Sequence, residues 1–82
     1  SMKFILSLII CSQAANICIP PHQYHEKFDD AYTCMLKGYE LSYQKTEEMG
    51  AEEVNKYNIY IKFNCDAVED TEKTPTSFDK LV

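Results

Sequence analysis

The chain contains no arginine and no tryptophan, and only two of its 82 residues are glycine. Its eight basic residues are all lysine and stand against 13 acidic residues, which gives a formal net charge of −5. Nucleic-acid binding relies on a basic face and on bidentate arginine contacts, so the composition disfavours this function. An acidic chain is equally unsuited to an anionic membrane surface. The composition instead favours a module that meets a basic or apolar protein partner.

The sequence also lacks the motifs of common catalytic and cofactor sites. It has no glycine-rich phosphate loop, no ordered Ser-His-Asp set and no C-x-x-C pair. His22, His25 and Asp29 lie within two helical turns, a spacing that matches no recognised zinc site. Cys34 borders the apolar side of an expected helix, where a thiol is usually inert packing. We therefore expect no catalysis, no metal and no cofactor.

No apolar run is long enough to cross a bilayer, which takes about 20 apolar residues. The longest run, residues 3–19, is interrupted by Ser12, Gln13 and Asn16. Its first part resembles a secretory signal over about residues 2–14, because a short charged start precedes an apolar segment and small residues follow it. On this interpretation the mature chain is a small secreted factor.

The same stretch also has the periodicity of a buried helix. Apolar side chains recur at steps of three and four, at Phe4, Leu8, Cys11, Ala15 and Cys18. Most of the leucine and isoleucine of the chain lies before Pro20, so a domain without this stretch would have few aliphatic side chains for its core. We therefore favour a core helix over residues 4–19.

The expected bonding of the cysteines depends on which of these two interpretations holds. On one helix, Cys11 and Cys18 would lie about 10 Å apart, too far for a disulfide, so both are expected to be small buried side chains. Removal of a signal would leave three cysteines, and an odd count predicts one internal and one intermolecular bridge. The secreted alternative is therefore a disulfide-linked dimer that encloses an apolar ligand between tyrosine- and methionine-rich faces.

A second helix is expected over residues 23–45, after the break that Pro20 and Pro21 impose. Large side chains recur there at steps of three and four, at Phe28, Tyr32, Met35, Tyr39 and Tyr43. Such a stripe is typical of the buried side of an amphipathic helix. Gly50 then marks a helix end or a turn.

The segment after Gly50 fits two structures. Residues 57–65 alternate between apolar and polar side chains, as a half-buried strand does. Apolar residues between Val54 and Val68 also recur at helical steps, which predicts a helix over residues 51–68. No second alternating run exists in the chain, and a lone strand would have no partner. We therefore favour the helix.

Together these elements predict a small all-α domain, a three-helix antiparallel bundle over residues 3–69, followed by an acidic or polar tail or linker over residues 70–82. Thr74, which precedes a proline in this tail, is a candidate phosphorylation site. Ser1 and Met2 resemble the remnant of a removed tag, which suggests a fragment of a larger intracellular protein.

The expected function is a non-catalytic protein–protein interaction module, an adaptor that presents a tyrosine- and acid-lined surface to a protein partner, with a homodimer as one arrangement. Tyrosine is favoured at such interfaces because its ring can be buried while its hydroxyl stays hydrated. Tyr24, Tyr43 and Tyr60 are the residues expected to bind the partner. The alternative is the small secreted helical factor described above.

Overall fold

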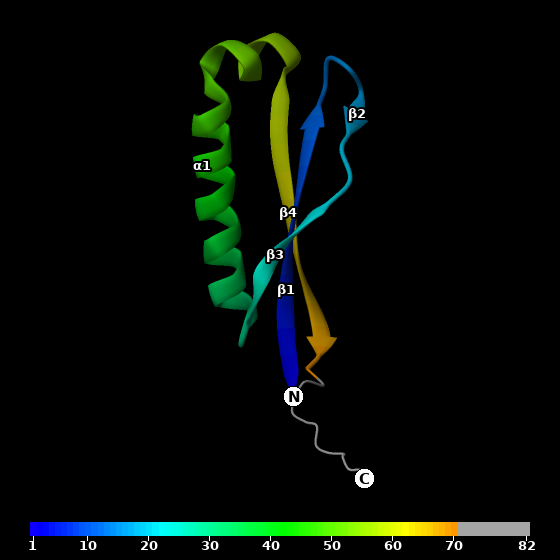
Figure 1. Ribbon diagram of the computed structural model, residues 1–82, viewed down its shortest axis with the longest axis vertical. Helices are drawn as coiled ribbons and strands as arrows, with labels where there is room; N and C mark the ends of the chain where they lie inside the picture. Colours follow the sequence, from blue (N-terminus) through cyan, green and yellow to red (C-terminus); the bar gives the residue numbers. More distant parts are fainter. Residues whose placement is uncertain (71–82) are drawn as a thin grey trace.

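The computed structural model describes residues 1–70 and consists of one helix packed on a four-stranded antiparallel sheet (Figure 1). The elements in chain order are β1 (Met2–Ser12), β2 (Ile17–Cys18), β3 (His22–Phe28), α1 (Ala31–Tyr57) and β4 (Ile59–Glu69). The expected all-α three-helix bundle is therefore wrong, because the chain folds as a mixed α/β domain. Residues 71–82, which include Thr74 and nearly all of the expected tail, lie outside the described residues.

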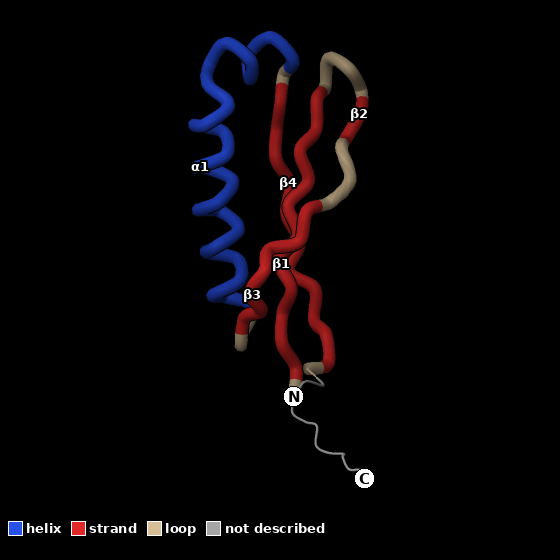
Figure 2. The backbone as a smooth tube through the Cα atoms, viewed as in Figure 1, coloured by secondary structure: helices blue, strands red, loops and turns tan. Residues whose placement is uncertain are grey.

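Strand β1 is the centre of the sheet. It pairs with β4 along its whole length, from Met2 opposite Glu69 to Ser12 opposite Ile59. Its other edge pairs with β3 near the N-terminus and with β2 near its C-terminal end, and the long β1–β4 ribbon is strongly twisted (Figure 2). The core helix expected over residues 4–19 is therefore wrong, although the segment does lie at the centre of the fold. Cleavage after residue 14, as in the signal interpretation, would remove the strand that joins all the others.

Strand β4 follows the alternation seen in its sequence. Ile59, Ile61, Phe63 and Cys65 are half-buried, whereas the residues between them are exposed. The helix expected over residues 51–68 is therefore wrong for this part. The partner of β4 is β1, whose side chains are apolar on both faces, so it shows no alternation that the sequence could reveal.

Helix α1 is capped by Asp30 before its first residue and by Asn58 after its last. The Asp30 carboxylate accepts a 2.7 Å hydrogen bond from the backbone N–H of Thr33, and this bond lowers the pKa of Asp30. Asn58 has φ 50°, and its N–H donates to the Val54 carbonyl. The break expected at Gly50 is a kink inside α1, with φ 87° and ψ 159°.

Both pairs of cysteines form disulfides, Cys11 with Cys18 and Cys34 with Cys65, and no free cysteine remains. The expectation that Cys11 and Cys18 are too far apart is wrong, because they face each other across the β1–β2 hairpin with Cα atoms 4.0 Å apart. The chain accordingly has no thiol left for the intermolecular bridge expected of the secreted alternative.

The core lies between α1 and one face of the sheet. Leu6 and Cys34 are completely buried, and half-buried aromatic and aliphatic side chains surround them: Phe4, Tyr24, Phe28, Leu41, Ile61 and Phe63. The opposite face of the sheet carries Ser7 and Ile9 of β1 beside Asn64 and Lys62 of β4. Figure 1 shows α1 lying along one side of the sheet only.

Candidate interaction surfaces

The side of α1 that faces the sheet carries small residues. Cys34 and Gly38 are the buried residues of the helix, and Ser42 lies one turn further along. A Cβ atom at Gly38 would overlap the ring of Phe63 on β4. The absence of a side chain therefore allows the helix to approach the sheet closely, and the Cys34–Cys65 bridge joins the two elements at the same level.

Apart from Leu41, which packs against the core, most of the large side chains in the first half of α1 are exposed. Four of them follow one another at steps of four, three and four residues, and we call them the tyrosine ridge: Tyr32, Leu36, Tyr39 and Tyr43, with exposed fractions of 73%, 52%, 62% and 70%. The helical stripe in the sequence is typical of a buried side, and this prediction is wrong for Tyr32, Met35 and Tyr39. Tyr43, which is expected to bind a partner, is exposed as that role requires. Phe28, the first residue of that stripe, lies outside the helix and is half-buried in β3.

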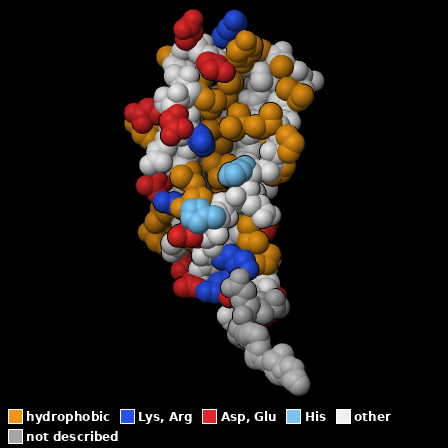
Figure 3. Space-filling model, in the orientation of Figure 1, with side chains coloured by type: hydrophobic (Ala, Val, Ile, Leu, Met, Phe, Trp, Pro, Cys, Tyr) orange, Lys and Arg blue, Asp and Glu red, His pale blue; other side chains and the backbone are white. Residues whose placement is uncertain are grey.

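Acidic side chains flank the ridge. The helix carries five glutamates and three lysines, a net charge of −2. Figure 3 shows acidic side chains interleaved with hydrophobic ones along the side of the molecule where α1 lies. Lys37 donates a 3.3 Å hydrogen bond to Glu40, and this bond, together with the charge of Glu40 and the neighbouring Tyr24, raises the pKa of Lys37. The ridge is therefore an apolar stripe in an acidic setting.

An open groove of about 490 Å³ runs between α1 and β4. Met35 and Tyr39 line its helix side, and residues 61–65 line its strand side. The Tyr39 ring meets the Phe63 ring edge-on, with centroids 4.9 Å apart. Tyr39 therefore belongs both to the tyrosine ridge and to this groove.

A second groove, of about 410 Å³, lies on the opposite flank of α1, beside β1 and β3. His22 and His25 both line it, together with Lys45 and mostly apolar neighbours. Figure 3 shows the two histidines beside a hydrophobic band. Asp29, which the sequence analysis considers as a metal ligand together with these histidines, forms an ion pair with Lys3 instead. Across residues 1–70, no group of three or more His, Cys, Asp or Glu side chains is arranged to hold a metal ion.

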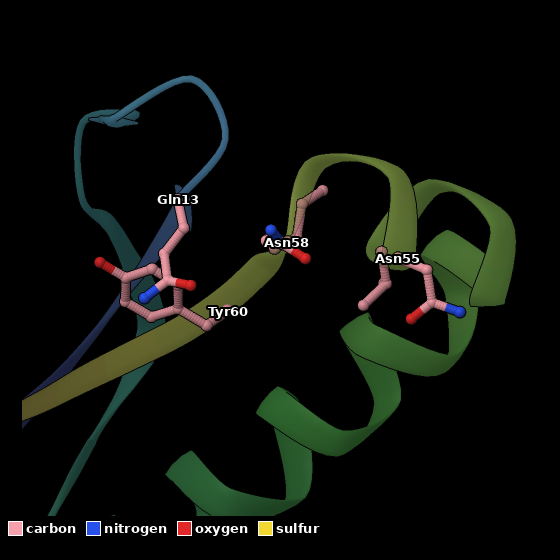
Figure 4. Close-up of a pocket in the computed structure, with 6 residues that line it drawn as sticks. Gln13, Asn55, Asn58 and Tyr60 are labelled. Atoms are coloured by element: carbon pink, nitrogen blue, oxygen red, sulfur yellow. The ribbon is translucent and has the colours of Figure 1, made fainter.

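A shallow pocket of about 350 Å³ lies where α1 turns into β4. Figure 4 shows Gln13 and Tyr60 on one side of it and Asn55 and Asn58 on the other. The Gln13 N–H donates to the Asn58 carbonyl over 3.1 Å, which ties the β1–β2 turn to the end of the helix. Apart from the Tyr60 phenol, the side chains that line this pocket are amides and aliphatic groups.

The three tyrosines expected to bind a partner do not form one surface. Tyr43 lies on the tyrosine ridge, whereas Tyr24 is half-buried in β3 and stacks on Phe28. Tyr60 is exposed at the start of β4, beside the pocket of Figure 4. Sequence reasoning missed Tyr32 and Tyr39 as surface residues because it assigned their helical stripe to the core.

The sequence-based expectation of no catalysis stays a prediction, with one detail added. Cys34 is completely buried and bonded to Cys65, so it has no thiol to act as a nucleophile. Within the described part of the chain, no helix is both long and apolar enough for a bilayer span. Comparisons with protein-family models, with curated proteins and with solved structures found no match to this chain.

Proposed function

We propose that the chain is a non-catalytic protein-binding module and that the tyrosine ridge of α1 is its docking surface. The observation that carries this proposal is the orientation of the helix, which exposes Tyr32, Leu36 and Tyr43 while it buries Cys34 and Gly38. Soluble monomers rarely expose a contiguous row of large apolar side chains, and such rows commonly mark interaction sites. Tyrosine is also one of the side chains most enriched at binding hot spots.

The chemistry of the ridge favours a basic, amphipathic partner. Tyr32, Leu36 and Tyr43 supply the apolar contacts, and the glutamates beside them, Glu40 and Glu47, complement lysine or arginine at the rim. The ridge runs along a helix, and its spacing of four, three and four residues matches the anchors of helix-to-helix recognition. A partner helix with one apolar stripe and basic flanks fits this surface.

The disulfides bear on where this binding takes place. Disulfides persist in oxidising compartments and are rare in the cytosol, so the two bridges favour an oxidising setting for the folded chain over an intracellular one. We therefore propose a secreted or otherwise oxidised setting. This setting is compatible with the binding function, because the Cys34–Cys65 bridge lies on the buried side of α1 and leaves the ridge exposed.

Selection of peptides from a display library against the oxidised chain tests the proposal. We expect the selected ligands to be basic and amphipathic. Alanine substitutions Leu36→Ala and Tyr43→Ala should each weaken their binding about tenfold or more, measured by calorimetry. Tyr60→Ala is the matched control, because it removes an exposed tyrosine outside the ridge. Ligands that lack basic residues, or that bind both ridge variants as tightly as the parent chain, would overturn the assignment.

A further inference from the structure

A free strand edge lies beside the groove between α1 and β4. Among the described residues, β4 pairs only with β1, so its second edge has no strand beside it. The strand is 11 residues long, contains no proline, and keeps a continuous register with β1 from Met2 to Ser12. Natural proteins usually shorten, bulge or cover such an edge, because its unpaired backbone groups attract another strand.

The groove offers room and contacts for an added strand. Five consecutive residues of β4, residues 61–65, line it along the strand, and Met35 and Tyr39 form its opposite wall. Both of these α1 side chains are exposed in the single chain. A strand added to β4 would therefore gain backbone hydrogen bonds from the edge and apolar contacts from the helix.

We propose that this strand is β4 of a second copy, paired antiparallel about Asn64. In that register Lys62 lies opposite the partner's Asp66, and the two-fold symmetry repeats this ion pair on the other side. On the face that carries α1, Phe63 lies opposite the partner's Cys65 and Ile61 opposite the partner's Ala67. Along the strand, oppositely charged side chains thus lie opposite each other, and apolar side chains lie opposite apolar ones.

Other registers lose this match. A pairing centred on Lys62 places two lysines opposite each other, and a pairing centred on Asp66 does the same with two aspartates. Like charges directly opposite in a sheet are destabilising. Pairings centred on Phe63 or Cys65 avoid like charges but leave Lys62 and Asp66 without a charged partner across the strands. The register about Asn64 is the one that sets both Lys62 and Asp66 opposite a charge of the other sign.

The symmetry also places the helices. A two-fold axis at Asn64, perpendicular to the sheet, leaves both copies of α1 on the same face of one continuous sheet. The flank of α1 that carries Met35 and Tyr39 borders the free edge of β4, so the two flanks turn toward each other across the axis. Tyr32, Leu36 and Tyr43 stay on the outer side of each helix. The dimer is thus separate from the proposed peptide binding, with which it shares only Tyr39.

Sedimentation equilibrium of the oxidised chain over a range of concentrations tests the pairing. We expect a monomer–dimer equilibrium that Lys62→Asp weakens at least about tenfold, because symmetry sets two pairs of like charges opposite each other. The double exchange of Lys62→Asp with Asp66→Lys should restore dimerisation, since it recreates both ion pairs in reverse. Lys56→Asp is the control, because it makes the same change of net charge on the helix instead of on β4.

Several results would overturn the inference. If the chain stays monomeric at millimolar concentration, β4 does not pair with a second copy. The free edge of β4 would then be available to a strand of another protein. A dimer that ignores Lys62→Asp, or one that the double exchange does not restore, pairs through another surface. None of these results would affect peptide binding at Leu36 and Tyr43, so failure of the dimer and failure of the proposed function are distinguishable.

Discussion

The two sides of helix α1 are made from opposite kinds of residue. The side against the sheet carries the small residues Cys34, Gly38 and Ser42, with Leu41 as its one large core side chain in this stretch. The outer side carries the large side chains of Tyr32 and Tyr43. An amphipathic helix normally buries its large apolar side chains. Here a covalent bridge and a close backbone approach set the orientation of the helix instead. The exposed stripe is therefore available for a partner, because the inner side packs against the sheet without it.

Removal of the disulfide on the inner side should have the largest effect on the fold. The double substitution of Cys34→Ala and Cys65→Ala should lower the free energy of unfolding by roughly 4 kcal/mol, since the bridge closes a loop of 31 residues. Removing Cys11–Cys18, which closes a loop of seven, should cost about 2.5 kcal/mol. Urea denaturation of both double variants at one protein concentration measures the difference. An equal or reversed order would show that Cys34–Cys65 is not the main clamp.

A side chain at Gly38 is the next largest change. Gly38→Ala should lower the free energy of unfolding by about 2 kcal/mol, because the added methyl group overlaps the Phe63 ring. The intrinsic preference of a helix for alanine over glycine acts in the opposite direction by about 1 kcal/mol. The sign of the measured change therefore decides which effect wins. A stabilised variant would mean that the helix does not lie so close to β4.

Ser42 offers the reverse test on the same side of the helix. Its Oγ is buried without a hydrogen-bond partner. Ser42→Ala removes this unsatisfied group and improves helix propensity, so the free energy of unfolding should rise by about 1 kcal/mol. Gln44→Ala, at an exposed position in the same turn, controls for propensity alone. If the free energy of unfolding rises equally in both variants, burial of the Ser42 hydroxyl does not destabilise the fold.

The smallest effect is expected on the outer side. Tyr43→Ala should change the free energy of unfolding by no more than about 0.5 kcal/mol, because the ring is 70% exposed. The same variant should bind the selected peptides poorly. Thermal unfolding measured beside the binding experiment sharpens the contrast between the two sides. A loss of stability as large as that of Gly38→Ala would place Tyr43 in the core.

The sequence allowed part of this fold to be predicted. A helix with a stripe of large residues was expected over residues 23–45, and α1 does occupy the later part of that range. The alternation of residues 57–65 also indicated a strand, and β4 is that strand. The sequence nevertheless favours a helix there, because apolar residues also recur at helical steps and no partner strand can be recognised.

The strand that pairs with β4 is β1, and its sequence pattern does not identify it as a strand. A central strand is apolar on both faces, so its pattern cannot be distinguished from that of a buried helix. Burial of residues 4–19 could be inferred, but the type of element could not. The orientation of α1 was hidden for a different reason. It depends on the Cys34–Cys65 pairing and on Gly38, and cysteine connectivity cannot be deduced from sequence alone.

Non-reduced tryptic mapping of the chain tests the central claim most directly, because the Cys34–Cys65 bridge determines which side of α1 faces outward. Cleavage after the lysines places Cys11 and Cys18 in one peptide, residues 4–27, and separates Cys34 and Cys65 into residues 28–37 and 63–73. We predict that the first peptide is lighter than its reduced form by two hydrogen atoms, and that the other two are linked until reduction. Free thiols, or a link from residues 4–27 to either of the other peptides, would contradict the fold and the outward orientation of the tyrosine ridge.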